Sequence, residues 1–467
     1  MSIYQRKILF FIALSEKKIY NNIADITELK EKRKMTYTQA VEKINSLLVF
    51  GSRPGLERIR EMVDRMGAPD RSLKFVHIAG TNGKGSTCAM IASALKEAGY
   101  KTGLFISPYV LEFRERFSIN GEMIPESELS EIVEELFPLV EEMKSEDKVI
   151  TEFEFVLAIA LRWFEREKCD IVVLETGLGG RFDATNIIDT PLASVITSIS
   201  LDHTAILGDT VEKIAFEKAG IIKPDGTTVL YADQPSGALK VLSDIAEERR
   251  NKIFLADASK AEIKKYDISG TVFEFETAEK KWEISISLCG EHQVKNCVTA
   301  LYTLIALRDK GINIPDNAVT EGFKKVSFSA RMEIFSKEPL ILLDGAHNPG
   351  GAKALSEALK KYIPSKKKIG IVGMLADKDI KTALGELLPL FDTIYTVAPP
   401  NPRRMTAEDL CSLIKPICKN VSACKSAEEA FELALSSTKP EDALVVFGSL
   451  YLASEMRPII IEKLNAK

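Results

Sequence analysis

Residues 75–86 read Phe-Val-His-Ile-Ala-Gly-Thr-Asn-Gly-Lys-Gly-Ser, and this stretch decides which fold we expect. The apolar run over residues 75–79 predicts a buried β-strand, and the pattern over residues 86–98 predicts a helix that ends at Gly99. Glycines between a strand and a helix let backbone N–H groups close on phosphate oxygens, and the helix N-terminus adds positive potential. Lys84 can then reach the terminal phosphates of a nucleotide. We interpret residues 80–86 as a phosphate-binding loop, although their spacing departs from the standard Walker pattern.

Strands and helices alternate along the chain after this loop. Apolar runs predict buried strands at residues 102–106, 171–174, 193–198 and 228–231, and helical patterns cover residues 126–143 and 153–167. This alternation is typical of a parallel sheet with helices on its faces. Residues 271–275 and 282–286 alternate between polar and apolar side chains, which predicts a small antiparallel insert.

A second α/β alternation begins after Arg331. Its predicted strands lie near residues 340–343, 368–372, 393–397 and 443–447. We expect a smaller, doubly wound, Rossmann-like domain there. The chain therefore divides into an N-terminal extension (residues 1–34), a nucleotide-binding central domain (residues 35–329) and a C-terminal domain (residues 330–467). The expected fold class is α/β.

Composition excludes several classes of protein. The 467 residues are 45% hydrophobic and 28% charged with a net charge of −5, so no global positive field attracts nucleic acid or anionic lipid. Seven cysteines without a CxxC pair indicate free thiols in a reducing compartment. The apolar run over residues 8–14 is too short to span a membrane, and charged residues follow it where a signal peptidase site would stand. We expect a cytoplasmic protein without nucleic-acid or membrane partners.

Two further motifs follow predicted strands. Glu175 ends one strand and precedes a glycine-rich segment with Arg181 in it, while His203 comes shortly after the next strand. The carboxyl ends of parallel strands share one edge of a sheet, so both side chains would lie near the phosphate loop. Glu175 could hold the magnesium that accompanies ATP. His203 could ligate a metal, with Asp202 orienting the imidazole. The Arg181 guanidinium could donate two hydrogen bonds to a carboxylate or phosphate.

Other candidates also have a structural interpretation. His77 lies within a strand and is read as a buried histidine with its hydrogen bonds satisfied. Lys218 stands near a helix end, where local sequence indicates a charge that complements the helix dipole. Asn296 could bind a base or ribose, and residues 344–349 form a polar turn after a strand, but helix capping would explain both.

In order along residues 35–455, the motifs resemble those of folylpolyglutamate synthase, in the Mur ligase superfamily of ATP-dependent, amide-forming ligases. The matching segments are residues 80–86, 107–108, 113–121, 151–154, 175–186, 201–218, 292–296, 344–349, 377–379 and 448–451. The resemblance implies a P-loop-containing, Mur-ligase-like ATPase domain followed by a glutamate ligase domain. Two segments depart from the family pattern: residues 328–331 lack the usual Pro-Gly before Arg331, and Tyr109 stands where His is common.

The resemblance also implies roles for individual residues. ATP would be bound by Gly80, Thr81, Asn82, Gly83, Lys84, Gly85 and Ser86 from one side and by Asn296, Arg331, Asp344 and His347 from the other. Magnesium would be held by Ser107, Glu175 and His203, and a carbamylated Lys218 would bridge a second ion. Lys84, Lys218 and His203 would be the catalytic residues.

The implied reaction adds L-glutamate to the γ-carboxyl of the glutamyl tail of a reduced folate through an acyl phosphate. Its substrates are anionic small molecules, so an acidic protein needs a basic cleft, and the candidate residues are Arg114, Arg116, Arg181, Arg403 and Arg404. Arg403 and Arg404 could equally be a solvated pair in a loop. Asp183 is a further candidate substrate contact. We expect the chain to act as a monomer.

Three alternatives stay open. Dihydrofolate synthase activity, which adds the first glutamate to dihydropteroate, uses the same motifs. A cell-wall Mur ligase would be expected to carry an additional N-terminal domain, for which the chain ahead of the phosphate loop is short. A nucleotide-binding regulatory protein would lack turnover, and the full set of candidate magnesium ligands argues against it.

Overall fold

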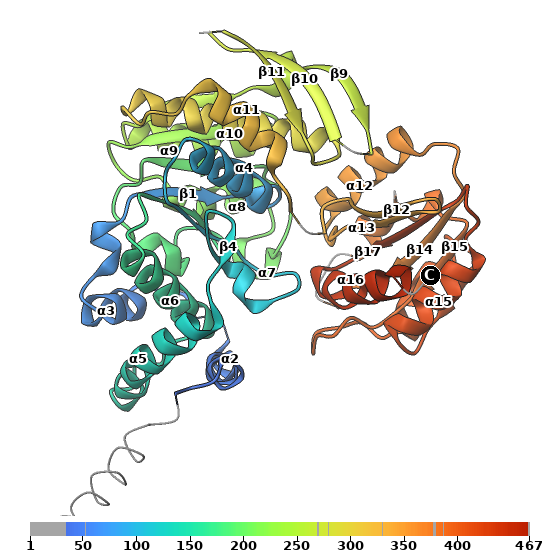
Figure 1. Cartoon of the computed structure of the whole chain (residues 1–467), viewed down its shortest axis with the longest axis horizontal. Coiled ribbons are helices and arrows are strands. Elements are labelled where there is room, and N and C mark those ends of the chain that lie inside the picture. The colour runs from blue at the N-terminus through green and yellow to red at the C-terminus, as the bar shows by residue number, and fades with distance from the viewer. Residues whose placement is uncertain are drawn as a thin grey trace, which may run out of the picture.

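The computed structural model describes residues 34–465 except residues 52, 269, 279, 329, 377–379 and 386. The expected extension therefore lies almost entirely outside the described residues, as does the motif at 377–379. The predicted strand and helix around the phosphate loop form β1 (Phe75–Ala79) and α4 (Lys84–Glu97). They belong to the larger of two α/β units (Figure 1).

An eight-stranded sheet with the order β4-β3-β2-β5-β1-β6-β7-β8 organises the first unit. The parallel strands are β1, β2 (Thr102–Phe105), β5 (Ile171–Glu175), β6 (Ala193–Ile196), β7 (Thr227–Tyr231) and β8 (Lys252–Ala256), and β3 (Phe117–Ile119) and β4 (Glu122–Met123) run antiparallel at one edge. Because β1 pairs in parallel with both β5 and β6, their carboxyl ends meet at one edge of the sheet. The loops after these three strands carry most of the candidate site.

Helices cover both faces of this sheet. Side chains alternate along β1, so Phe75 packs with one group of helices and Val76 with the other. The Phe75 side carries α2 (Tyr37–Ser46), α3 (Glu57–Arg65), α5 (Glu126–Ser145) and α6 (Glu152–Arg166). The Val76 side carries α4, α10 (Glu291–Asp309) and α11 (Asp316–Lys325). The helices α7 (Thr204–Leu207), α8 (Val211–Lys218) and α9 (Ser236–Glu248) complete the unit.

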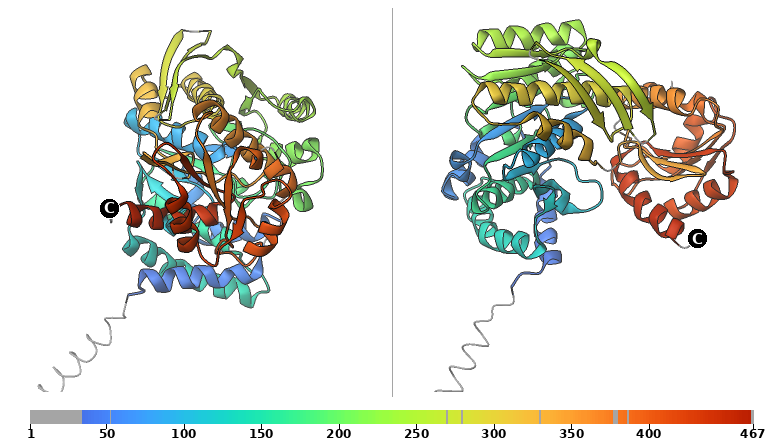
Figure 2. Two further views of the ribbon diagram at one scale, coloured as in Figure 1. Left: turned by 90° about the vertical axis from the view of Figure 1, so that its right-hand side faces the viewer. Right: turned by 45° about the horizontal axis from the view of Figure 1, so that its top comes forward.

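The antiparallel insert is present and is larger than predicted. Strands β10 (Gly270–Glu276) and β11 (Lys281–Ile286) form the expected hairpin, and β9 (Glu262–Asp267) adds a third strand. The insert extends toward the second unit (Figure 2). There Tyr266 makes an edge-to-face ring contact with Tyr362 at 5.5 Å between centroids, so the insert touches the second unit directly.

The second unit has the expected doubly wound architecture. Its sheet order is β12-β13-β17-β14-β15-β16, with β12 (Glu333–Lys337) antiparallel and β13 (Leu340–Leu343), β14 (Lys368–Val372), β15 (Thr393–Thr396), β16 (Val421–Ala423) and β17 (Ala443–Phe447) parallel. Its helices are α12 (Pro349–Tyr362), α13 (Ile380–Gly385), α14 (Ala407–Ile414), α15 (Ala427–Ser437) and α16 (Leu450–Asn465).

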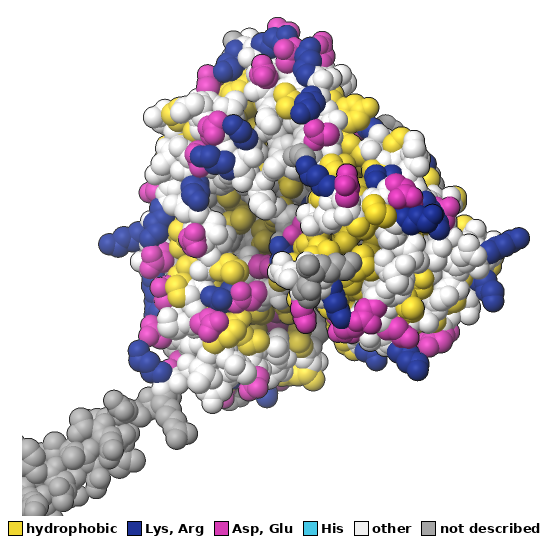
Figure 3. All heavy atoms as spheres, turned by 45° about the vertical axis from the view of Figure 1, so that its right-hand side comes forward, with side chains coloured by type: hydrophobic (Ala, Val, Ile, Leu, Met, Phe, Trp, Pro, Cys, Tyr) yellow, Lys and Arg dark blue, Asp and Glu magenta, His cyan; other side chains and the backbone are white. Residues whose placement is uncertain are grey.

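Two expectations from composition can be compared with the structure. All seven cysteines are free, as predicted. In the described part of the chain, no helix combines the length and apolarity that a membrane crossing requires. Acidic and basic side chains are interspersed on the face that includes both units (Figure 3).

Candidate functional site

Two cavities meet between the two units. One of about 590 Å³ surrounds residues 80–86 and is called the phosphate-loop cavity, and one of about 680 Å³ lies at the N-terminus of α6 and is called the α6 cavity. Both are lined by Ser107, Pro108, Gly177, Leu178, Gly179, His203, Leu207, His347 and Leu450. The two cavities therefore adjoin each other along these residues.

The phosphate loop is held closely by its neighbours. Gly83 precedes α4 with φ +83°, and a Cβ there would overlap the side chain of Asn296, so both the conformation and the close approach require glycine. The backbone N–H of Thr81 donates to the carbonyl oxygen of Ser198 at 2.8 Å. Lys84 Nζ lies 3.4 Å from the carbonyl oxygen of Thr81 and 3.8 Å from Glu175 Oε1. Residues 80–86, with this ammonium, line the cavity.

Glu175 is buried beside the loop. Its Oε2 accepts a hydrogen bond from the backbone N–H of Ser107 at 3.3 Å. Burial raises the pKa of the Glu175 carboxyl, and the nearby Lys84 ammonium partly counters that rise. A buried carboxylate with one long hydrogen bond and one distant cation would be stabilised by a further positive charge.

The four predicted metal ligands, Ser107, Glu175, His203 and Lys218, all line the phosphate-loop cavity. Among the described residues, no three side chains of the types His, Cys, Asp and Glu lie close enough to enclose a metal ion. Magnesium usually takes only one or two protein carboxylates and completes its coordination with phosphates and water. The donors at this edge of the sheet fit that incomplete kind of site.

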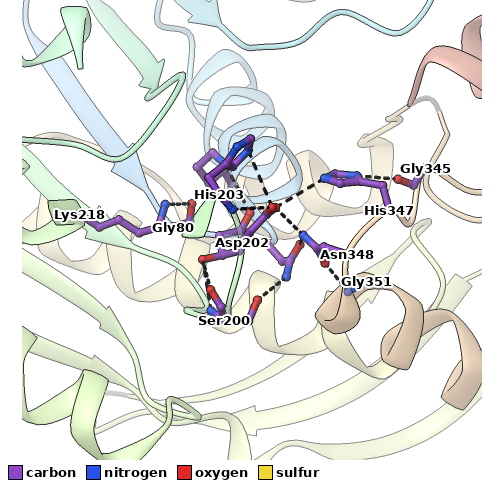
Figure 4. A network of polar contacts seen from close by, with 12 residues as sticks. Gly80, Ser200, Asp202, His203, Lys218, Gly345, His347, Asn348 and Gly351 are labelled. Carbon is purple, nitrogen blue, oxygen red and sulfur yellow. Dashed lines mark hydrogen bonds and ion pairs between the residues drawn. The ribbon is translucent and has the colours of Figure 1, made fainter. Parts of the chain in front are cut away.

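Lys218 corrects the interpretation from local sequence. Its side chain does not extend into solvent as a charge at a helix end but is buried, with Nζ donating to the carbonyl oxygen of Gly80 at 2.7 Å (Figure 4). Burial, aided by the positive charge of Lys84, lowers the pKa of the Lys218 amine to about 7. The amine is therefore substantially uncharged near neutral pH.

The predicted nucleotide contacts on the far side, Asn296, Arg331, Asp344 and His347, also line the phosphate-loop cavity. Asp344 accepts hydrogen bonds from the backbone N–H groups of Met332 and Ala346 at 2.9 and 2.8 Å, which fixes the turn after β13. His347 Nδ1 lies 3.0 Å from the carbonyl oxygen of Gly345. The second unit thus supplies one wall of the cavity.

Only some of the basic residues predicted to bind substrate line a cavity. Arg116 and Arg403 line the α6 cavity, and Arg116 Nη1 lies 3.0 Å from Glu152 Oε1 while its Nε has no hydrogen-bond partner among the described residues. Arg114 is not at either cavity, because Glu112 and the carbonyl oxygen of Ile124 bind its guanidinium.

Arg181 and Arg404 also lie off the lining of both cavities. The Arg181 guanidinium is stacked over Phe182, 4.5 Å from the ring centroid, and lies 3.6 Å from Glu217. Arg404 lies in an isolated β-bridge with Leu375. Their roles as substrate contacts stay predictions that this arrangement does not favour.

Asp183 lines the α6 cavity, and its carboxylate is used by the protein itself. It accepts from the backbone N–H of Leu178 at 2.7 Å and from the hydroxyl of Thr185, and thereby shapes the glycine-rich turn. His77 Nε2 lies 2.8 Å from the same hydroxyl, which confirms that this histidine is buried with a partner, but its Nδ1 has no hydrogen-bond partner among the described residues, so its hydrogen bonds are not all satisfied as predicted. Because the hydroxyl donates to Asp183, it accepts from His77.

Two residues at the site escaped prediction. Arg53 lines the α6 cavity from the segment between α2 and α3, where glycines at 51 and 55 were the available signal. The sequence places Asn348 only in a polar turn, yet its amide contacts the first unit across the boundary. Neither contact is visible in a local sequence pattern.

Comparisons with known proteins agree with this geometry. Residues 78–304 match the Mur ligase middle domain, and residues 330–450 match the glutamate ligase domain of Mur ligases. The dihydrofolate synthase/folylpolyglutamate synthase of Bacillus subtilis is 37% identical over 426 residues, covering 90% of this chain and 98% of the relative.

Solved structures give the same assignment. Mycobacterium tuberculosis folylpolyglutamate synthase complexed with ADP and AMPPCP superposes with a TM-score of 0.83 at 30% identity, covering 91% of this chain and 99% of that one. Escherichia coli FolC in complex with DHPP and ADP gives a TM-score of 0.79 at 30% identity, covering 92% and 98%. The chain belongs to the folylpolyglutamate synthase family of Mur ligases, which are ATP-dependent enzymes that form amide bonds.

Proposed function

We propose that this protein adds L-glutamate to the γ-carboxyl of the glutamyl tail of a reduced folate and converts ATP to ADP and phosphate. The observation that carries the proposal is the junction of the two cavities at Ser107, His203 and His347. ATP bound along the phosphate loop would place its γ-phosphate at this junction. A folate tail in the α6 cavity would bring its carboxylate to the same point.

The first step is in-line transfer of a phosphoryl group. A carboxylate oxygen attacks the γ-phosphorus, the bond to the β,γ-bridging oxygen breaks, and ADP leaves with that oxygen. Lys84 and the loop N–H groups stabilise the charge that spreads over the transferring group. The product is an acyl phosphate on the folate.

The second step forms the amide. The neutral amine of glutamate attacks the acyl carbon, and the tetrahedral intermediate expels inorganic phosphate, which keeps one oxygen of the original carboxyl and takes up the proton that the amine releases. Water would hydrolyse the acyl phosphate, so the two units must keep it out of the junction. Arg116 and Arg403 are the basic side chains that we assign to anionic substrate in the α6 cavity.

Magnesium fits the donors at the junction. Ser107, Glu175 and His203 would hold the ion, and the burial of the Glu175 carboxyl with only one hydrogen bond of 3.3 Å and Lys84 Nζ 3.8 Å away is the observation that supports a cation beside it. When bound, the ion would neutralise charge on the nucleotide phosphates.

We infer that Lys218 is carbamylated and provides a ligand for a second ion. Its buried amine, with a pKa of about 7, is the uncharged nucleophile that reacts with carbon dioxide: a nitrogen–carbon bond forms and the nitrogen loses a proton. The product is a carboxylate in place of a cation.

The remaining assignments are proposals of the same kind. Residues 35–329 would bind ATP and residues 330–467 would bind glutamate, with residues 1–34 as an extension. All partners would be small molecules, and we expect a cytoplasmic monomer.

Dihydrofolate synthase is a second candidate activity. The Bacillus subtilis relative carries both names, and the Escherichia coli structure contains DHPP. The test is mass spectrometry of products formed from ATP and glutamate with either dihydropteroate or tetrahydrofolate monoglutamate. Glutamate added to tetrahydrofolate supports the proposal, addition only to dihydropteroate favours the alternative, and no addition to either excludes both.

A further inference from the structure

Asn348 uses every polar atom of its side chain. Oδ1 accepts a hydrogen bond from the backbone N–H of Gly351 at 2.8 Å and so caps α12. That bond orients the amide, and Nδ2 faces the first unit, where it donates to Asn82 Oδ1 and to Asp202 Oδ2, each at 3.0 Å. With its side chain buried, Asn348 has two donors and one acceptor, all satisfied.

The two acceptors belong to the centre of the site. Asn82 is in the phosphate loop, and its own Nδ2 donates to Ser200 Oγ at 3.1 Å. Asp202 Oδ1 accepts from the backbone N–H of His203 at 2.8 Å, and Asp202 Oδ2 lies 3.8 Å from His347 Nε2. Figure 4 shows Asp202 between the two histidines, with Asn348 approaching from the second unit.

Helix capping alone does not explain the choice of asparagine here. Ser, Thr and Asp cap helices about as well. Among these residues, only asparagine can cap α12 and also donate two hydrogen bonds across the boundary. An aspartate would place a second carboxylate against Asp202, and a serine has one hydroxyl proton and a shorter reach.

We propose that Asn348 is a positioning residue for the ligation, whose amide fixes the position of the C-terminal unit relative to the phosphate loop. The contact holds the wall formed by His347 against the loop, so the acyl phosphate meets the amine rather than water. The inference rests on the proposed function and adds to it the residue that couples the two units.

The variant Asn348→Asp tests this directly. It keeps an acceptor for the Gly351 N–H and therefore keeps the cap. Asn82 can turn its amide and donate to the new carboxylate while the Ser200 hydroxyl donates to Asn82 Oδ1, so the variant loses the hydrogen bond to Asp202 and sets two carboxylates against each other at that point. A hydrogen bond to a charged group is worth about 1.5–3 kcal/mol, so kcat should fall roughly 10- to 100-fold. More than one ADP should be released per amide bond, and the far-UV circular dichroism spectrum of the variant should match that of the wild type, because each unit keeps its own core.

Ser426→Asp is the matched control. Ser426 caps α15 in the same unit by accepting from the backbone N–H of Glu429, and it lines neither cavity, so the variant adds the same charge at a cap away from the boundary. It should keep wild-type turnover and one ADP per amide bond.

A double variant tests whether the effect comes from the hydrogen bond between Asn348 and Asp202. In Asn348→Asp combined with Asp202→Asn, the hydrogen bond re-forms with donor and acceptor exchanged, and turnover should recover roughly tenfold from the single variant. A double variant that stays at the level of Asn348→Asp would overturn the inference, as would wild-type kcat and stoichiometry in Asn348→Asp.

A readout without turnover separates this inference from the proposed function. In the ligand-free protein, Asn348→Asp should increase deuterium exchange in peptides that cover residues 80–86 and 198–204. Unchanged exchange there would contradict the coupling between the units. Failure of the wild-type protein to form amide would instead contradict the proposed function.

Discussion

The Nζ atom of Lys218 lies 2.7 Å from the carbonyl oxygen of Gly80, in the interior of the protein. The contact places the end of α8 against the first residue of the phosphate loop. Burial and the Lys84 ammonium lower the pKa of the Lys218 amine to about 7, whereas an exposed lysine would be fully charged near neutral pH. The structure thus puts a buried amine where local sequence indicated only a charge that complements the helix dipole.

Lys218 should therefore take up carbon dioxide. We expect a carbamate resonance in ¹³C NMR after equilibration with labelled bicarbonate, and its disappearance in Lys218→Met together with a fall in turnover of roughly 100-fold or more, because a charge-stabilising group of the site is removed. Lys213→Met on the same helix changes an exposed lysine paired with Asp209 and should leave both unchanged. Wild-type turnover in Lys218→Met would refute this role.

Lys84 should be needed for phosphoryl transfer and not for folding. Lys84→Ala removes the ammonium that faces the cavity, and we expect ADP release to fall by roughly 100- to 1,000-fold with the thermal midpoint retained. Lys74→Ala, which removes an exposed lysine just before β1, serves as the control. Undiminished glutamate-dependent ADP release in Lys84→Ala would rule out the assigned role of the loop.

Replacing Arg116 and replacing Arg114 should have different effects on KM for the folate acceptor, although the two residues are close in sequence. Arg116 lines the α6 cavity and Arg114 does not, so Arg116→Ala should raise KM for the folate acceptor roughly 10- to 100-fold, the value of a charge-assisted hydrogen bond, while KM for ATP changes little. Arg114→Ala should affect neither constant strongly. Steady-state kinetics with each substrate varied in turn measures both KM values. Equal effects of the two variants would count against binding of the folate acceptor in the α6 cavity.

His77 should make stability depend on pH. Burial lowers the pKa of His77 from its ordinary 6.5 to about 3. Between these values the unfolded chain binds a proton that the folded protein does not, so the free energy of unfolding should rise with pH through this window and be fully gained above pH 6.5.

Urea unfolding of the wild type and of His77→Gln at several pH values measures that contribution. Glutamine can still donate to the Thr185 hydroxyl but does not titrate, so the variant should show a smaller gain between about pH 4 and pH 6.5. Parallel curves for the two proteins would show that His77 does not titrate as its burial requires.

The sequence alone is sufficient to predict the buried parallel strands of both sheets. The strands around β1 and β14 are continuous apolar runs, because each is covered on both faces, and such runs are readable without a structure. The strands that were missed are β3, β4, β8, β9, β12 and β16. Strand β9 carries Glu262, Lys264 and Lys265, and an exposed strand of this kind lacks the apolar run on which the prediction depends.

The site was predictable where a motif follows a strand and not where a contact crosses between units. Glu175 and His203 were found because strand ends share an edge of the sheet. Local sequence indicates for Lys218 only a charge that complements the helix dipole, and the packing of α8 against Gly80 shows its burial. Asn348 reaches Asn82 across 266 residues of chain, a contact that no local spacing encodes.

The most direct test of the central claim follows the oxygen of the acceptor carboxyl. With the γ-carboxyl of the folate tail labelled with ¹⁸O, the phosphate released during ligation should contain one labelled oxygen, because the carboxylate attacks the γ-phosphorus and the amine later expels phosphate with that oxygen. Amide formation accompanied by unlabelled phosphate would contradict the account.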